Sequence, residues 1–144
     1  MVEPRRFRTT LAVSLLIAIS AIAQRPETYK VRLTPVSMDA AMKVDIAGSG
    51  SATAMLTGAA LVVNGTFDGL LSPATTAQIR RGSVTGVRGP AVLDLTVSRA
   101  TNGTVSGKFG LTPDQVESLR KGRLYIQIGS EKAPDGNLWG WLLP

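Results

Sequence analysis

The chain contains no cysteine and no histidine, and it has few aromatic side chains. Without cysteine it forms no disulfide bonds, so its stability depends on an apolar core, which a chain of 144 residues can supply. Zinc, copper and haem sites rely mainly on cysteine and histidine. Ser-His and Cys-His nucleophile pairs also need histidine. The composition therefore excludes the commonest metal centres and nucleophilic enzymes, and we expect no cofactor.

The chain also lacks an apolar run long enough to span a bilayer. Its longest run, Leu11–Ala23, has thirteen residues, whereas a transmembrane helix needs roughly 20. A basic segment precedes this run, and Ala21-Ile22-Ala23 ends it with the small side chains that signal peptidase requires. Residues 1–23 are therefore predicted to be a Sec-type signal peptide, cleaved between Ala23 and Gln24. We expect a secreted or periplasmic protein with no transmembrane segment after cleavage.

The positive charge of the chain is dispersed along its length. The net charge is +6, and removing residues 1–23 leaves thirteen basic and nine acidic side chains. Nucleic-acid-binding proteins usually gather their charge on one face and add aromatic side chains that stack on bases. Because the basic residues here are mostly isolated and aromatic residues are scarce, we expect no nucleic-acid partner.

After a short leader over residues 24–28, the chain shows the period-two alternation of half-buried strands. Two Asn-Gly pairs, Asn64-Gly65 and Asn102-Gly103, lie between apolar runs and favour hairpins, because a type I′ turn needs positive φ at both central residues. In all, the sequence shows seven or eight short strands separated by turn signals. This number predicts one all-β domain, a Greek-key β-sandwich over residues 29–144. Strands with a clear alternation are expected at Thr28–Val36, Met42–Ile46, Ser51–Leu56, Leu124–Ile128 and Asn137–Leu143.

One short helix is predicted after residue 112. Thr112 is suited to the N-cap, Pro113 to the first turn, and Gln115 completes a capping box. Gly122 provides the stop signal.

Arg80, Arg81 and Arg88 lie in a glycine-rich stretch that precedes an apolar run. Guanidinium groups suit phosphate and carboxylate ligands, so these three residues are candidates for an anion-contacting loop. In the alternative interpretation, they cap carbonyl groups or pair with Asp94. The stretch is no phosphate-binding P-loop, because it lacks the Gly-Lys-Ser/Thr ending and leads into a strand.

Trp139 and Trp141 are the most distinctive side chains of the sequence. Strand alternation places both on one face of Asn137–Leu143 and the leucines on the other. An exposed tryptophan pair favours a binding patch for a partner. In the alternative, the two rings pack beneath a loop.

The acidic residues show no spacing that pairs two carboxylates in a pocket. Asp68, Asp114 and Asp135 lie in turns or at the start of the helix. We therefore expect no enzymatic activity, and a carboxylate-dependent hydrolase is the alternative.

The sequence resembles the CHRD domain, the module named after chordin, over roughly Tyr29 to Leu143. The family's closing motif is matched in order, and an upstream motif that ends in Gly-Pro and an apolar run is matched as well. The matching residues of the closing motif are Leu111, Thr112, Gln115, Leu119, Gly122, Tyr125, Ile126, Ile128, Pro134, Gly136, Leu138, Gly140 and Leu142; those of the upstream motif are Ala77, Ile79, Gly82, Gly86, Gly89, Pro90, Val92 and Leu95.

The resemblance implies an exported all-β domain with an immunoglobulin-like or copper/zinc superoxide-dismutase-like layout. Gln78, Arg80 and Gly129 stand where the family often carries histidine. A guanidinium is no metal ligand and glycine has no side chain, so any metal site of relatives is lost here. We therefore expect a structural or binding module with a protein or glycan partner outside the cytoplasm. Besides the hydrolase, the alternative is a degenerate dismutase-like sandwich without its metal.

Overall fold

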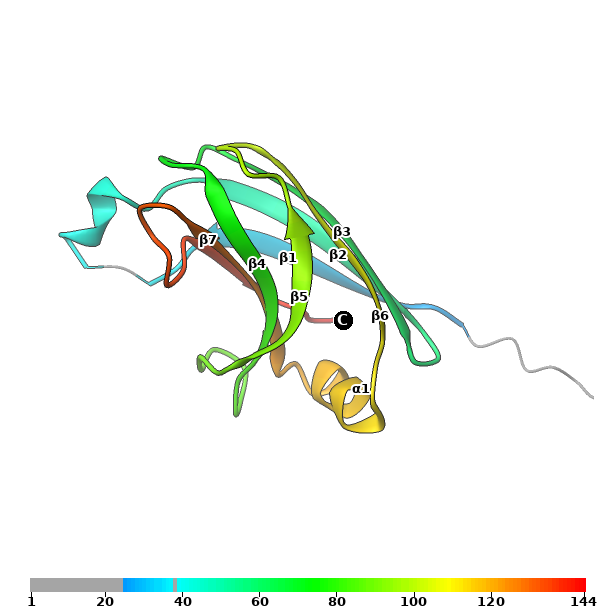
Figure 1. The fold of residues 1–144 in the computed structure, drawn as a ribbon. Helices are drawn as coiled ribbons and strands as arrows, with labels where there is room; N and C mark the ends of the chain where they lie inside the picture. Colours follow the sequence, from blue (N-terminus) through cyan, green and yellow to red (C-terminus); the bar gives the residue numbers. More distant parts are fainter. Residues whose placement is uncertain (1–24, 38) are drawn as a thin grey trace, which may run out of the picture.

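The computed structural model describes residues 25–37 and 39–144, and within this part the strands form one closed antiparallel barrel (Figure 1). Their order around the barrel is β1-β2-β3-β6-β5-β4-β7-β8, after which β8 returns to β1. A short 3-10 helix, η1 (Met42–Val44), follows β1, and an α-helix, α1 (Pro113–Arg120), precedes β7. The predicted signal peptide, residues 1–23, lies outside the described residues. The strands are β1 (Glu27–Pro35), β2 (Ser49–Thr57), β3 (Ala60–Asp68), β4 (Ala74–Arg81), β5 (Ala91–Val97), β6 (Gly103–Gly110), β7 (Leu124–Ser130) and β8 (Leu138–Trp141).

Closure of the barrel contradicts the predicted Greek-key β-sandwich. An open sandwich leaves edge strands unpaired, whereas here β8 pairs with β1, with Thr34 opposite Trp139 and Pro35 opposite Leu138. Closure gives the backbone groups of both strands partners and removes the exposed edges. The all-β content with one short α-helix is confirmed for the described residues, but the architecture is a barrel.

The inside of the barrel is filled by alternate residues of the strands, as period-two alternation requires. In β1 the buried residues are Tyr29, Val31 and Leu33, and in β8 they are Leu138 and Gly140. The helix α1 packs Leu119 against the same core. This leaves Trp139 and Trp141 on the outer face of β8, as the alternation predicted.

Two local predictions are wrong. Asn64-Gly65 forms no hairpin but lies in the middle of β3, opposite Thr53 and Ala52. The turn between β2 and β3 falls at Gly58, whose φ is +64°. Gly65 is needed because a Cβ there would lie 2.7 Å from the Cβ of Ala52. The expected strand at Met42–Ile46 is instead the 3-10 helix η1, since no neighbouring strand pairs with it in the described structure.

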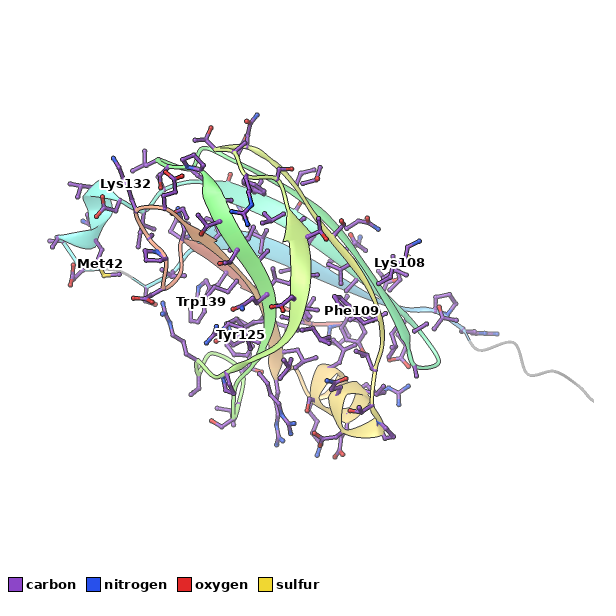
Figure 2. All side chains as sticks on the ribbon, viewed as in Figure 1. Met42, Lys108, Phe109, Tyr125, Lys132 and Trp139 are labelled. Atoms are coloured by element: carbon purple, nitrogen blue, oxygen red, sulfur yellow. The ribbon has the colours of Figure 1, made fainter. Side chains whose placement is uncertain are left out.

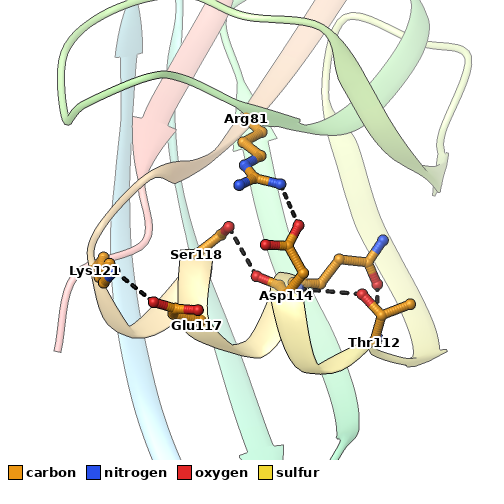
Figure 3. Close-up of polar contacts among 7 residues, drawn as sticks. Arg81, Thr112, Asp114, Glu117, Ser118 and Lys121 are labelled. Atoms are coloured by element: carbon orange, nitrogen blue, oxygen red, sulfur yellow. Dashed lines mark hydrogen bonds and ion pairs between the residues drawn. The ribbon is translucent and has the colours of Figure 1, made fainter.

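The helix agrees with expectation, and the second Asn-Gly pair agrees in part. Asn102-Gly103 lies at the connection between β5 and β6, but Asn102 has no positive φ, so the pair does not form the predicted type I′ turn. At the start of α1, the Thr112 hydroxyl accepts the amide N–H of Gln115 at 3.2 Å, and the Gln115 side chain accepts the amide N–H of Thr112 at 3.0 Å (Figure 3). The predicted capping box is therefore confirmed. The chain turns away from the helix at Gly122, whose φ is +69°.

A buried tyrosine closes the core near the start of β1. Tyr29 is 2 % exposed, and its hydroxyl donates a hydrogen bond of 2.9 Å to Glu27. Glu27 also forms an ion pair of 2.6 Å with Arg120 of α1, which lowers the pKa of Glu27. Burial, and then the hydrogen bond to Glu27, raise the pKa of Tyr29 to about 12.

This raised pKa predicts a loss of stability in alkali. Tyrosine in the unfolded chain ionises near pH 10, while folded Tyr29 keeps its proton up to about pH 12. The stability that neutral Tyr29 contributes is therefore complete below pH 10 and lost as the pH rises to about 12. Urea unfolding at about pH 9 and about pH 11 measures this decline. We expect a smaller decline in Tyr29→Phe, and an equal decline in both proteins would contradict the assignment.

Candidate binding surface on the outer face of the barrel

β7 is buried on both of its faces, and this identifies the covered part of the barrel's outer surface. Leu124, Ile126 and Ile128 point into the core, yet Tyr125 and Gln127 on the outer face are buried as well. Outer-face residues of a barrel strand are buried only when another segment lies over them. Two connections supply this cover, residues 82–90 after β4 and residues 131–137 after β7.

Strand register brings most of the predicted site residues onto this face in two rows. In one row, Gln78 of β4 lies opposite Gln127 of β7, which lies opposite Trp139 of β8. In the neighbouring row, Arg80 lies opposite Tyr125, which lies opposite Trp141. Alternation on each strand and pairing between strands thus place Arg80 and both tryptophans on one surface, although they are far apart in sequence.

Tyr125, Trp139 and Trp141 form an aromatic cluster on this surface. The ring of Tyr125 lies 4.5 Å from that of Trp141 and 5.8 Å from that of Trp139 between centroids, and the two tryptophans are 5.9 Å apart. The edge-to-face pairs suit the charge distribution of aromatic rings. The guanidinium of Arg88 lies 5.4 Å from the Trp139 ring centroid, within the range of a cation–π contact. Figure 2 shows Tyr125 and Trp139 side by side.

Both tryptophans are half-buried, so the structure combines features of the two alternatives drawn from the sequence. Trp139 also packs against a small apolar cluster of Val36, Ile46 and Ala133. Trp141 lies beneath the start of the covering loop, since its ring would be 2.9 Å from a Cβ at Gly82. The rings therefore support the loops while keeping part of their surface accessible.

The Gly82–Pro90 loop is attached to the sheet through Gly89. The Tyr125 hydroxyl accepts the Gly89 N–H at 3.0 Å, and it lies 3.2 Å from the Gly89 carbonyl oxygen, to which it donates. Arg80 Nε donates to the same carbonyl at 2.9 Å. A Cβ at Gly89 would overlap the Arg81 carbonyl, so only glycine fits this approach. Sequence reasoning missed this role of Tyr125, although its place on the second face of Leu124–Ile128 could have indicated it.

The three candidate arginines have different environments. Arg81 at the end of β4 forms an ion pair of 2.5 Å with Asp114 of α1, shown in Figure 3. Arg80 is held by Gly89 and by the Gln78 side chain, whose oxygen it reaches at 2.9 Å. Among the described residues, no carboxylate lies within 4.0 Å of the guanidinium groups of Arg80 and Arg88. Two of the three positive charges are therefore held in place without a neutralising partner.

A hydrogen-bonded chain occupies the positions at which the family often carries histidine. Gln78 donates to Asp94 at 3.3 Å and accepts from Arg80. Asp94 thus contacts Gln78, in place of the arginine that the sequence suggested. At Gly129, a Cβ would lie 2.7 Å from Thr76 Oγ1 and 3.0 Å from the Pro134 carbonyl oxygen, so this site has no room for a side chain. These residues do not fit a metal ion, because the main polar groups at these positions are an amide and a guanidinium.

In the part of the chain that the structure describes, acidic side chains form neither a buried group nor a cluster suited to a metal ion. No carboxylate there is buried, and no three side chains of the metal-ligating types Asp, Glu, His and Cys lie together. The carboxylates with perturbed pKa values are Glu27 and Glu117, and hydrogen bonds from Arg120 and Lys121 lower both. A general acid needs the opposite shift.

The half-buried tryptophans predict intermediate accessibility to a neutral quencher. Acrylamide is expected to quench their fluorescence well below the extent seen for free tryptophan. Arg88→Ala should increase the quenching, because the guanidinium covers the ring of Trp139. Arg99→Ala, which removes an exposed arginine from the β5–β6 connection, serves as the control. Equal quenching in all three proteins would contradict the position of Arg88.

Comparison with protein-family models matched the CHRD domain over residues 31–142. The match includes all of the strands except the start of β1, and it includes every residue of the two rows described above. Searches of curated proteins and of solved structures gave no match. Among the helices of the described residues, none has the length and apolar character needed to cross a membrane.

Proposed function

The chain belongs to the CHRD domain family, and we propose that it is a non-catalytic binding module that recognises a negatively charged partner outside the cytoplasm. The proposed contact surface is the Gly82–Pro90 loop with Arg80, Arg88 and the aromatic cluster beneath them. A protein or a glycan that carries anionic groups would fit this surface.

The observation that carries the proposal is the fixed but unneutralised charge of Arg80 and Arg88. Arg80 is oriented by Gly89 and Gln78, and Arg88 by the face of Trp139. An arginine that is already held loses less side-chain entropy when it binds an anion than a free one does. Its guanidinium can then donate two parallel hydrogen bonds to a carboxylate, sulfate or phosphate group.

The surface offers contacts for binding rather than groups for catalysis. Its polar side chains are mainly glutamine and arginine, and the exposed carboxylate of Asp94 accepts a hydrogen bond from Gln78. A carboxylate-dependent hydrolase would need two acidic groups about a pocket, with the pKa of one raised, whereas none of the described carboxylates is buried and the pKa values of Glu27 and Glu117 are lowered. The binding module is therefore the better-supported of the two candidate functions.

Export is a separate part of the proposal and rests on the sequence of residues 1–23 alone. We expect the mature protein to begin at Gln24. Mass spectrometry of the N-terminal peptide, taken from periplasmic and culture-medium fractions, tests this. A chain that retains residues 1–23 in the cytoplasmic fraction would contradict export.

Retention on immobilised heparin, a soluble polyanion, tests the anion-binding surface. The double variant Arg80→Ala/Arg88→Ala is expected to elute at clearly lower salt than the unmodified protein, because two unpaired charges are lost from one surface. The matched control is Arg99→Ala/Lys108→Ala, which removes the same charge from exposed positions elsewhere. Equal shifts for both double variants would show that retention depends only on net charge, and would contradict the proposed surface.

A further inference from the structure

Three aliphatic side chains are exposed at the end of the barrel that carries α1. Val84 is 54 % exposed, Val87 46 % and Leu143 44 %, all unusually high for their type. Val84 and Val87 belong to the Gly82–Pro90 loop, which projects beside α1 at the lower end of the molecule in Figure 1. Isolated exposed apolar residues are common on proteins, so the question is whether these three form one surface.

Hydrogen bonds and close contacts hold the three side chains in one region. The Val87 N–H donates to the Val84 carbonyl at 3.2 Å, which folds the loop tip into a turn. The Thr85 hydroxyl donates to the Gly122 carbonyl at 2.7 Å, which fixes the tip against the end of α1. A Cβ at Gly122 would lie 3.0 Å from Leu143 and 3.1 Å from Thr85 Oγ1, so Leu143 lies next to the tip.

Basic residues lie on the Gly82–Pro90 loop and on the segments next to it. The side chains at this end include six basic groups (Arg80, Arg81, Arg88, Arg120, Lys121 and Arg123) against three carboxylates (Glu27, Asp114 and Glu117). All three carboxylates are engaged in the ion pairs with Arg81, Arg120 and Lys121. Arg80, Arg88 and Arg123 take part in none of these ion pairs. We call Val84, Val87, Leu143, Arg88 and Arg123 the tip surface.

We infer that the tip surface docks on an anionic lipid surface, with the two valines and Leu143 entering the headgroup region and the arginines at the level of the phosphates. This inference rests on the proposed recognition of a negatively charged partner, and it names an anionic lipid, in place of a protein or a glycan, as that partner. Peripheral proteins bind in this way when a small apolar area and nearby basic side chains act together.

Lipid accounts for the tip surface better than the other anionic partners do. A stable protein interface buries about 800 Å² on each side, far more than three aliphatic side chains on a projecting loop provide. Glycan recognition favours open aromatic faces, but Tyr125 is fully buried and the two tryptophans are half-covered. A bilayer needs no matching shape, and it gains from aliphatic side chains and from arginines alike.

Sedimentation with lipid vesicles tests the inference on the chain from Gln24 onward. Vesicles of phosphatidylcholine with about 30 % phosphatidylglycerol are expected to bind the protein, and vesicles of phosphatidylcholine alone to bind it much more weakly. Val84→Glu should weaken binding to the anionic vesicles at least about tenfold, and Arg88→Ala about fivefold. The matched controls are Val44→Glu, at a valine that is 71 % exposed on η1, and Arg99→Ala. Both controls should weaken binding less than their partners at the tip.

Quenching by brominated lipids gives a second readout that does not depend on the variants. Because Trp141 lies beneath the loop, bound anionic vesicles with brominated acyl chains should quench tryptophan fluorescence more than unbrominated ones. Absence of binding to anionic vesicles would overturn the inference, and so would equal losses at Val44 and Val84. If heparin retention still depends on Arg80 and Arg88 in that case, the partner is an anionic protein or glycan and the proposed function remains. If neither vesicle binding nor heparin retention depends on Arg80 and Arg88, both proposals fail.

Discussion

Tyr125→Ala is expected to lower the free energy of unfolding by about 3–5 kcal/mol, because it removes a fully buried aromatic ring and leaves a cavity. The ring contacts both tryptophans, and its hydroxyl holds Gly89 at both backbone groups. The loss would be a large fraction of the stability of an ordinary domain. Urea unfolding followed by far-ultraviolet circular dichroism measures it, since fluorescence itself changes when Tyr125 is removed.

Tyr125→Phe is the matched control for this prediction. It keeps the ring and removes only the hydroxyl, so the stability loss should be about 1–2 kcal/mol, from the unpaired Gly89 N–H. Losses of similar size in both variants would assign the effect to the hydroxyl, and a negligible loss in Tyr125→Ala would show that the outer aromatic cluster does not contribute to folding.

Gly140→Ala is expected to lower the free energy of unfolding by about 2–3 kcal/mol, because the added methyl group has no space at the seam of the barrel. A Cβ at Gly140 would clash with Val31 and lie 2.5 Å from the Arg32 carbonyl oxygen, both in β1. Since β1 and β8 form the pairing that closes the barrel, this substitution pushes the two strands apart. Urea unfolding measures the change.

Gly110→Ala provides the same chemical change where space is available. Gly110 lies at the end of β6, its φ is not positive, and a Cβ there would meet no atom within 4 Å. Its stability should therefore change by less than about 0.5 kcal/mol. If the two glycine variants are equally stable, the packing at the β1–β8 seam described above is wrong.

The structural features that the sequence predicted correctly are those that depend on local pattern. The capping box at Thr112 follows from residues three apart, and the outward direction of Trp139 and Trp141 follows from alternation within one strand. The all-β content and the family resemblance were also evident from the sequence, because spacing of short motifs carries both. These features need no knowledge of which strands become neighbours.

The features that the sequence did not predict depend on pairing between distant strands. Barrel closure rests on contacts between β1 and β8, about a hundred residues apart, and no residue type signals them. The Asn64-Gly65 pair satisfies the rule for a hairpin turn, but a continuous ladder from β2 to β3 outweighs that local preference. Likewise, Asp94 contacts Gln78 because register places them opposite one another.

For the candidate surface too, the sequence predicted the local features but not the contacts between strands. Sequence analysis identified Arg80, Arg81, Arg88 and the tryptophans as unusual, but it treated the arginines and the tryptophans as separate features. The register of β4, β7 and β8 joins them and adds Tyr125 as the residue that attaches the loop. The structure also separates Arg81, which pairs with Asp114, from Arg80 and Arg88, which have no such partner among the described residues.

We claim that hydrogen bonds hold the Gly82–Pro90 loop in one position on the sheet, and hydrogen exchange at the Gly89 amide tests this. That N–H donates to the Tyr125 hydroxyl at 3.0 Å, so its exchange in the native protein should be slow compared with an unprotected amide. The protection should be lost in Tyr125→Phe while the core amides of β7 remain protected. Rapid exchange of the Gly89 amide in the unmodified protein would contradict the claim.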